Sequence, residues 1–303
     1  MAFGTKGARL RLRTSGGEAT FQAFNYALLT LVSLSFIAPF LAIVSTSFVG
    51  ENELIRRGNF ILIPEQLDFS AYKVLLSEGS MLYHAYGITI LRVVLGTTLN
   101  LAFTAMLAYG LSRKDLPGRN VFITLVFVTM LFGGGLIPTY LLLKYMHLIN
   151  TFWVMIIPSL ISAWNLLIMK NFFAQIPERL IESATIDGAR PLTILARIVF
   201  PLSLPTFATI GLFYAVGIWN NFYSALIYLR NPDLVPLQVI LRNIVLAGQT
   251  NMDGTFTLGK DQKIVEESLK YATILVGTLP ILVTYPFLQK YFIKGVTVGS
   301  LKG

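Results

Sequence analysis

The chain has 303 residues, of which 54% are apolar and only 13% are charged. A soluble domain typically carries about 25% charged residues, and a disordered chain needs a still more polar composition. With a mean hydropathy of +0.67, the composition indicates a membrane protein. The net charge of +9 leaves two interpretations open, a nucleic-acid-binding surface or a basic face of another kind.

Six segments carry the roughly 20 mostly apolar residues that a transmembrane helix needs. The sequence therefore predicts an all-α integral membrane protein with six transmembrane helices, at Tyr26–Phe48, Ile88–Leu111, Val121–Leu143, Phe152–Met169, Leu204–Tyr228 and Tyr271–Leu288. The first segment is too long for the core of a signal peptide, which spans about 7–15 residues. Three consecutive glycines, Gly133 to Gly135, predict a break or kink in the third span.

The positive charges alternate from loop to loop. If the N-terminus is cytoplasmic, the inside segments hold fourteen Lys and Arg against five Asp and Glu, while the outside segments sum to −1. The positive-inside rule then places both termini in the cytoplasm, in a multi-pass protein of a bacterial cytoplasmic membrane. The net positive charge thus indicates which side of the membrane each loop faces, and we expect no nucleic-acid partner. The predicted organisation is a basic segment 1–25, a six-helix domain 26–292 with outer loops 50–87 and 229–270, and a cytoplasmic tail 293–303.

The inside loop 175–201 predicts a helix–turn–helix at the cytoplasmic surface. Pro177 suits the first turn of a helix, and Glu178 and Glu182 favour its N-terminal half. Gly188 is placed to end this helix in a left-handed conformation, and Pro191 to open a second helix. Periodicity alone leaves another interpretation equally open, an amphipathic connector resting on the membrane interface.

The spacing within this loop resembles the EAA motif of ABC importer permeases. That motif reads E-A-A, three residues, G, nine residues, I, one residue, L-P. It falls here on Glu182, Ser183, Ala184, Gly188, Ile198 and Pro201, with Ser183 in place of Ala and Phe200 in place of Leu.

The resemblance extends along most of the chain. The sequence resembles carbohydrate permeases of the maltose-transporter class, and most of all the branch that imports complex oligosaccharides and polysaccharide fragments, such as alginate or rhamnogalacturonan oligomers. The segments that carry it are Phe132–Tyr140, Asn150–Trp153, Asn165–Phe173, Phe213–Asn220, Ala225–Tyr228 and Gly295–Gly303.

This resemblance implies a type I ABC importer permease that carries out no chemistry itself. The expected partners are a homologous second permease, two copies of an ATPase that hold ATP and magnesium, an extracytoplasmic sugar-binding protein and membrane lipids. The motif residues with Asp187 would form a coupling helix seated on the ATPase, although Asp187 could simply make the turn with Gly188. In the tail, Gly299 and Lys302 would reach toward the ATPase.

The outer loop between spans five and six contains a match to the start of a phosphate-binding loop, Gly254–Lys260. Asp261 stands where that loop needs Ser or Thr, and no apolar strand precedes the match, so we expect no nucleotide binding there. The resemblance implies instead that the loop probes the binding protein. The candidate contact residues are Gln249, Thr250, Asn251 and Asp253, and a passive linker is the alternative.

The spans hold few polar candidates for a substrate path. Arg92 is the one charged residue in them, and snorkelling to lipid headgroups is favoured slightly over a role in substrate passage. If Arg92 faces the pore, it suits an anionic sugar. Trp164 with Asn165, and Trp219 with Asn220 and Asn221, pair aromatic faces with amides, which suits sugars, although interhelical hydrogen bonds explain the amides equally well.

Other functions have less support in the sequence. Cysteine is absent, and His84 and His147 are the only histidines, so we expect no metal site. An intramembrane enzyme or a secondary transporter would need carboxylates, a histidine or a serine–lysine pair within the spans. A permease for another solute, such as a glycerol-phosphate or another sugar derivative, remains an alternative.

Overall fold

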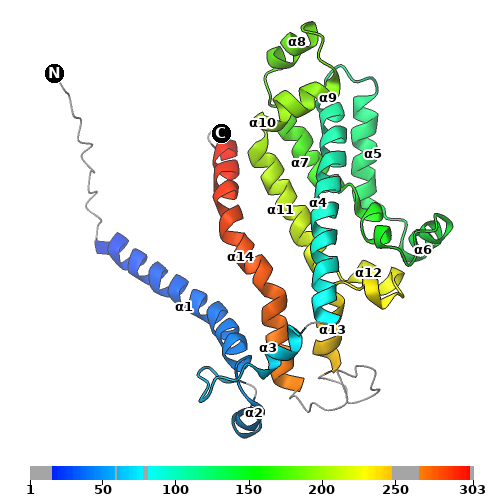
Figure 1. The fold of residues 1–303 in the computed structure, drawn as a ribbon. Coiled ribbons are helices and arrows are strands. Elements are labelled where there is room, and N and C mark those ends of the chain that lie inside the picture. Colours follow the sequence, from blue (N-terminus) through cyan, green and yellow to red (C-terminus); the bar gives the residue numbers. More distant parts are fainter. Residues whose placement is uncertain (1–15, 59, 78–80, 248–265, 301–303) are drawn as a thin grey trace.

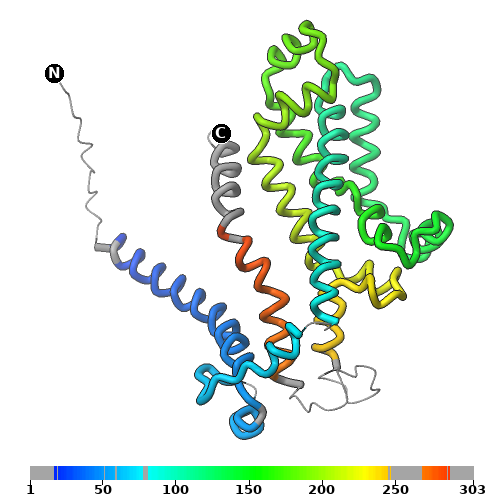
Figure 2. Tube along the Cα trace, viewed as in Figure 1, coloured from blue at the N-terminus to red at the C-terminus, as the bar shows by residue number. Residues whose placement is uncertain are grey.

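The computed structural model describes residues 16–58, 60–77, 81–247 and 266–300, and the regular structure in these residues is helical. Figures 1 and 2 show a bundle around a long central helix, with a further helix, α1, extending away from it. The longer helices are α1 (Gly16–Thr46), α4 (Met81–Ser112), α5 (Arg119–Leu131), α6 (Leu136–Tyr145), α7 (Ala163–Phe173), α8 (Glu178–Ile186), α11 (Leu204–Asn220), α13 (Leu237–Ala247) and α14 (Glu266–Ser300). The shorter ones are α2 (Glu51–Arg57), α3 (Ser70–Leu75), η1 (Phe152–Met155), η2 (Ile157–Ser159), α9 (Pro191–Ile194), η3 (Leu195–Val199), α10 (Phe200–Leu202), α12 (Tyr223–Tyr228) and η4 (Pro232–Leu234).

By length and apolar composition, two helices in the described residues can each cross a membrane alone, within α1 and α4. Three pairs of shorter helices meet the same length and composition criteria only when the two helices of a pair are counted together. Each of these pairs is bent at a short break. A shorter apolar helix, Ser268–Thr284, lies within α14. Each of the six predicted spans overlaps one of these helices or pairs, and the break in span three is the one that the sequence predicts.

Each break has a local cause. Between α5 and α6 the axis turns by 115° at Gly133 to Gly135, and Gly135 has a φ of 81°, which confirms the predicted break of span three. Span four was predicted as one helix but begins as 3-10 turns around Pro158, which lacks an N–H, and bends by 52° before α7. Span five ends early at Asn220, since Asn221 is extended and its side-chain oxygen accepts hydrogen bonds from the N–H and Oγ of Ser224, just after α12 begins at Tyr223.

The helix α4 is the centre of the bundle, with α7 and α11 packed against it and α14 packed against α11. One apolar cluster joins these helices to the α8 loop and includes Ala108, Met169, Ile181, Val199 and Ile210. Its side chains come from α4, α7, α8, α9, η3 and α11. Figure 1 shows α8 at one end of this bundle and α2, α3 and α13 at the other. Helix α1 contacts α14.

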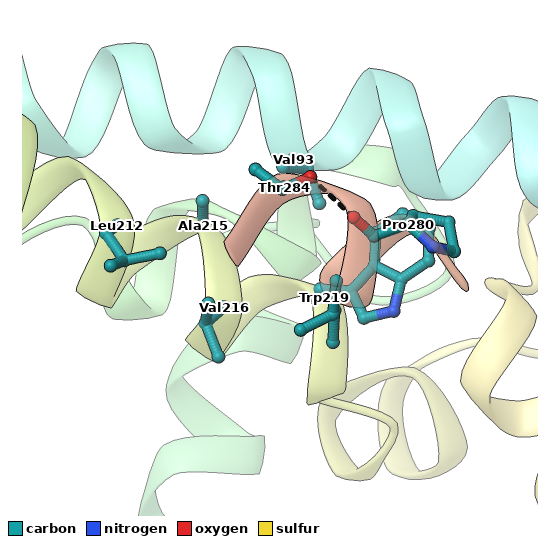
Figure 3. Close-up of a pocket in the computed structure, with 8 residues that line it drawn as sticks. Val93, Leu212, Ala215, Val216, Trp219, Pro280 and Thr284 are labelled. Atoms are coloured by element: carbon teal, nitrogen blue, oxygen red, sulfur yellow. Dashed lines mark hydrogen bonds between the residues drawn. The ribbon is translucent and has the colours of Figure 1, made fainter. Parts of the chain in front are cut away.

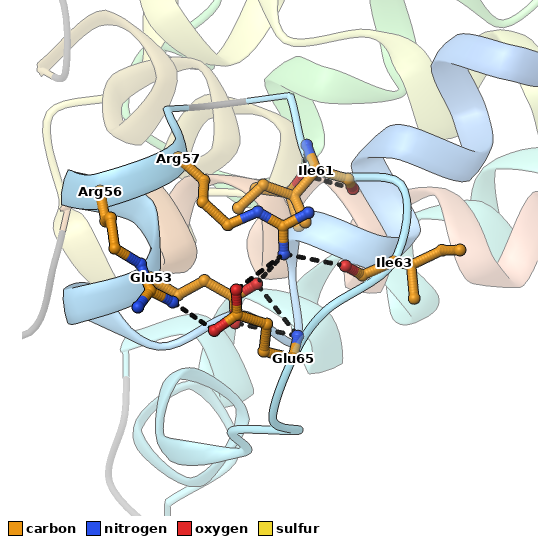
Figure 4. A network of polar contacts seen from close by, with 7 residues as sticks. Glu53, Arg56, Arg57, Ile61, Ile63 and Glu65 are labelled. Atoms are coloured by element: carbon orange, nitrogen blue, oxygen red, sulfur yellow. Dashed lines mark hydrogen bonds and ion pairs between the residues drawn. The ribbon is translucent and has the colours of Figure 1, made fainter.

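At the end opposite α8, a network of ion pairs links α2 to the segment that follows it (Figure 4). The carboxylate of Glu53 accepts the backbone N–H of Glu65 at 3.0 and 3.1 Å and an N–H of Arg57 at 2.6 Å. Arg57 also donates to the carbonyl of Ile63 at 3.2 Å, and Arg56 pairs with the Glu65 carboxylate. Partial burial by itself would raise the pKa of Glu53, but the Glu65 N–H and Arg57 outweigh it and hold that pKa below its usual range.

The turn between α6 and η1 is fastened to the segment after α12 through Asn150. This residue is left-handed, with a φ of 61°, and its N–H donates to the carbonyl of Tyr228 at 2.9 Å. Its side-chain oxygen accepts the backbone N–H groups of Arg230 and Asn231 at 2.9 and 2.8 Å. Two segments about 80 residues apart are thus joined by one amide side chain.

The Glu53 network predicts a pH-dependent stability. Because the folded pKa of Glu53 is depressed below its usual value of 4.5, its contribution is complete above that value and is lost as the pH falls through the folded pKa. In hydrogen exchange corrected for the intrinsic rate, protection of the Glu65 amide should therefore fall as the pH is lowered from about 6, above the usual pKa, to about 3, below it. The variant Glu53→Gln, which cannot ionise, should show no such fall, and an equal fall in both proteins would contradict this role.

Replacing Asn150 should loosen the contact between the α6 turn and the α12 segment. Asn150→Ala removes the acceptor of two N–H groups and puts a less tolerant residue at positive φ, so we expect a loss of about 1–2 kcal/mol in the free energy of unfolding. Asn150→Asp keeps both the acceptor and the tolerance and should stay near wild type. Denaturant titration in detergent micelles measures the difference, and equal stability of the two variants would refute the explanation.

Candidate functional site

The predicted helix–turn–helix is present as α8 followed by α9. Helix α8 ends at Ile186, and Asp187 caps its C-terminus. Gly188 has a φ of 79°, and Pro191 stands at the first position of α9, as the sequence predicts. The chain then continues through η3 and α10 to Leu202 and turns by 91° into α11.

The motif residues are divided between an exposed face and a packed one. Glu182, Ser183, Asp187, Gly188 and Pro201 are exposed, whereas Ala184 and Ile198 are partly buried against the apolar cluster. Ala184 thus lies on the same side of α8 as Ile181, where the helix packs on the core.

Large apolar side chains surround the exposed polar residues of this loop, and the sequence analysis did not single them out as contacts. Ile186 is 86% exposed, Leu192 is 64% exposed and Leu180 is 46% exposed. The helix has a single buried residue, Ile181, in its described span, so most of its surface is available to another molecule. An exposed apolar patch rimmed by polar groups is typical of a protein interface.

The bundle places Arg92 inside, which overturns the interpretation that it snorkels to lipid. Its side chain is 2% exposed. One terminal nitrogen donates to the carbonyl of Asn221 at 2.8 Å, and the other donates to Ser224 Oγ at 3.1 Å and to the carbonyl of Met155 at 3.4 Å. Arg92 therefore connects α4 to the break before α12 and to the 3-10 turn of η1.

A polar cavity of about 280 Å³ lies beside Arg92, between α4, η2, α7 and α11. It brings together three of the predicted path residues, Arg92, Asn165 and Asn221. Other polar side chains of its lining were not predicted from the sequence, namely Asn100, Ser159, Ser162 and Tyr214. Their positions come from three different helices and a break, so no local pattern in the sequence joins them.

The other predicted path residues lie elsewhere. Trp219 is buried in an apolar pocket of about 180 Å³ between α4, α11 and α14, where Val216 and Pro280 also lie (Figure 3). Its ring nitrogen donates to the carbonyl of Gly277 at 3.3 Å, and its ring packs edge-on against Tyr86. Trp164 is 62% exposed, and Asn220 is exposed as well.

The remaining candidates are only partly covered by the structure. Gly299 lies in the last turn of α14. Lys302 and the loop residues Gln249, Thr250, Asn251 and Asp253 lie outside the described residues. His84 Nε2 donates a hydrogen bond to the carbonyl of Asp233 at 2.8 Å, which fits an interfacial polar role. The described residues contain no cluster of ligands that could hold a metal ion.

The turn at Gly188 predicts a sharp difference between two variants. Gly188→Val places a β-branched residue at a φ of 79°, which costs about 1–2 kcal/mol, whereas Asn tolerates this region. We expect Gly188→Val to speed hydrogen exchange in α8 and α9 and Gly188→Asn to leave it near wild type. No atoms lie within 4 Å of an added Cβ, so equal acceleration in both variants would show that backbone strain is not the cause.

Comparison with known proteins assigns this arrangement to a family. Residues 117–298 match the family described as binding-protein-dependent transport system inner membrane component. The chain is 41% identical over 283 residues to the polygalacturonan/rhamnogalacturonan transport system permease protein YtcP of Bacillus subtilis (strain 168), covering 93% of this chain and 98% of the relative. It is 42% identical to protein LplC of the same organism, covering 93% and 95%.

A solved structure is similar as well. It is described as a bacterial ABC transporter involved in the import of the acidic polysaccharide alginate, and one of its chains aligns with a TM-score of 0.85 and 31% identity, covering 92% of this chain and 99% of that one. The chain belongs to the family of binding-protein-dependent transport system inner membrane components, as a permease subunit of an ABC importer.

Proposed function

We propose that this chain forms half of the translocation pathway of an ABC importer for oligosaccharides or polysaccharide fragments and couples to ATPase subunits through the loop 175–201. The observation that carries the proposal is the loop itself, an exposed helix with apolar and acidic side chains that is rooted in the central core by Ile181. A helix of this kind can receive a push from a partner and pass it on as a rigid body.

The coupling contact would use the exposed face of α8. Ile186 and Leu192 supply apolar area, and Glu182 supplies a carboxylate that can pair with a cation on the ATPase. Gly188 and Ser183 are small, so the partner can approach the backbone closely. Ala184 and Ile198 act on the inner side, where they hold the loop to the core.

The motion would reach the cavity through packed side chains. Ile181 of α8 belongs to the same apolar cluster as Met169 of α7 and Tyr214 of α11, and Tyr214 lines the polar cavity. Its hydroxyl also bonds Thr104 of α4 at 2.7 Å and accepts the N–H of Ser162 at 2.9 Å. A displacement of α8 therefore changes the relative positions of the helices that surround the cavity.

The orientation that fits this role places α8 and both termini in the cytoplasm, in agreement with the positive charge of the inside loops. A homologous second permease would complete the pathway, and two ATPase copies would hold ATP and magnesium. The C-terminal residues Gly299 and Lys302 would then lie on the ATPase side. The loop with Gln249, Thr250, Asn251 and Asp253 would face the sugar-binding protein outside.

The cargo follows from the relatives. The proteins most informative for this chain are a permease of polygalacturonan/rhamnogalacturonan transport and a permease of alginate import, which share 41% and 31% of its residues at aligned positions. These likenesses favour an oligosaccharide over a glycerol-phosphate or another small solute. An intramembrane enzyme is not favoured, because the described residues place no carboxylate or histidine beside the cavity.

Reversing the charge of Glu182 should uncouple transport. In the complete transporter with its ATPase and binding protein, Glu182→Lys should reduce co-purification of the ATPase and lower substrate-stimulated ATP hydrolysis at least about tenfold, the effect of losing a charge pair that is worth roughly 1.4 kcal/mol at a desolvated interface.

The matched control is Glu178→Lys, the same change on the same helix. The Glu178 carboxylate already contacts Lys114 within this chain at 3.3 Å, so we expect a much smaller effect on ATPase binding. If Glu182→Lys keeps full assembly and coupled hydrolysis, or if both variants lose them equally, the assignment of the α8 face is wrong.

A further inference from the structure

The cation in the polar cavity, Arg92, has no negative partner among the residues that the structure describes. Arg92 is always protonated, and its hydrogen bonds go to two carbonyls and one hydroxyl, all of them neutral. Within the described residues no Asp or Glu forms an ion pair with it or lines the cavity. A buried charge without a counterion gives its surroundings a positive potential, which is strong because the dielectric constant there is low.

Several hydrogen-bonding groups of the cavity are also unused. The Nε of Arg92 and the Oδ1 of Asn100 are buried without a hydrogen-bond partner. The side-chain amide of Asn165 makes no hydrogen bond to the described residues, although the residue is only 6% exposed. Buried polar groups usually have partners, so such a cluster of unused donors and acceptors indicates a ligand or bound water.

The position of the cavity suits a moving cargo. Arg92 and Asn100 lie on either side of the midpoint of α4, with Gly96 between them. A Cβ on Gly96 would lie 2.9 Å from the Cδ1 of Ile218, so α4 and α11 approach each other closely at this level. The cavity is thus bordered by closely packed helices, and two parts of its wall, η2 and the end of α11 at Asn221, adjoin interruptions of the helical structure.

Resting on the function proposed above, we propose that this cavity is a subsite for a carboxylate-bearing sugar unit. Arg92 supplies the positive potential that attracts the carboxylate, and Asn100, Asn165 and Tyr214 bind hydroxyl groups of the same unit. Arg92 itself also holds the two breaks together, so its replacement would disturb the fold. The charge of the cavity is therefore best changed at Asn165.

The test compares two probes of the same length in proteoliposomes that contain the complete transporter. One is trigalacturonate, and the other is its fully methyl-esterified form, which is neutral. Asn165→Asp is nearly isosteric and adds a negative charge beside Arg92. The new carboxylate would repel the carboxylate of the sugar at close range in a partly buried site. We therefore expect the ratio of acid to ester uptake to fall at least about tenfold.

Asn220→Asp is the matched control, because it adds the same charge at an exposed position of α11 that does not line the cavity. Its ratio should equal that of wild type. An unchanged ratio in Asn165→Asp, with ester uptake retained, would overturn the subsite and leave the proposed function intact. If the transporter does not assemble with Asn165→Asp, the variant Asn100→Asp adds the charge at the opposite wall of the cavity, and the same fall in the ratio of acid to ester uptake is expected. If wild type imports neither probe and neither stimulates ATP hydrolysis, the oligosaccharide function falls, and the subsite with it.

Discussion

Backbone that is not helical must find its hydrogen bonds within the protein when it crosses a membrane, because lipid offers none. Two interruptions of the regular helices meet at Arg92, the 3-10 turn of η1 and the extended residue Asn221 that follows α11. Its guanidinium reaches from the unbroken helix α4 to the carbonyls of Met155 and Asn221. The bundle therefore keeps a charged residue at its centre. The same side chain that stabilises the breaks gives the neighbouring cavity its positive charge.

The loop and the cavity are joined by one continuous core. Ile181 lies beneath the exposed helix α8, and Tyr214 lies at the wall of the cavity, and both belong to the cluster that includes Met169 and Val199. Close-packed cores transmit displacement because they have little room to deform. In the proposed coupling, a displacement of α8 would pass through this core to the helices that surround the cavity.

Much of the fold could be predicted from the sequence, because apolar length and glycine or proline placement are local properties. The six apolar segments, the break at Gly133 to Gly135 and the left-handed turn at Gly188 are examples. The breaks after Asn220 and around Pro158 were missed, since hydrophobicity continues across them. The burial of Arg92 and its meeting with Asn100 and Asn165 were not predictable either. They depend on how α4, α7 and α11 pack, which no sequence spacing records.

In the proposed function, the α8 end of the bundle faces the cytoplasm and receives the ATPase. The chain contains no cysteine, so Ser183→Cys creates one reactive site on the exposed face of α8. Labelling of this cysteine with a membrane-impermeant maleimide tests both the orientation and the contact. We expect labelling in inside-out vesicles stripped of ATPase, protection when the ATPase is added back, and no labelling in right-side-out vesicles. Labelling from the outside, or labelling that the ATPase does not reduce, would contradict it.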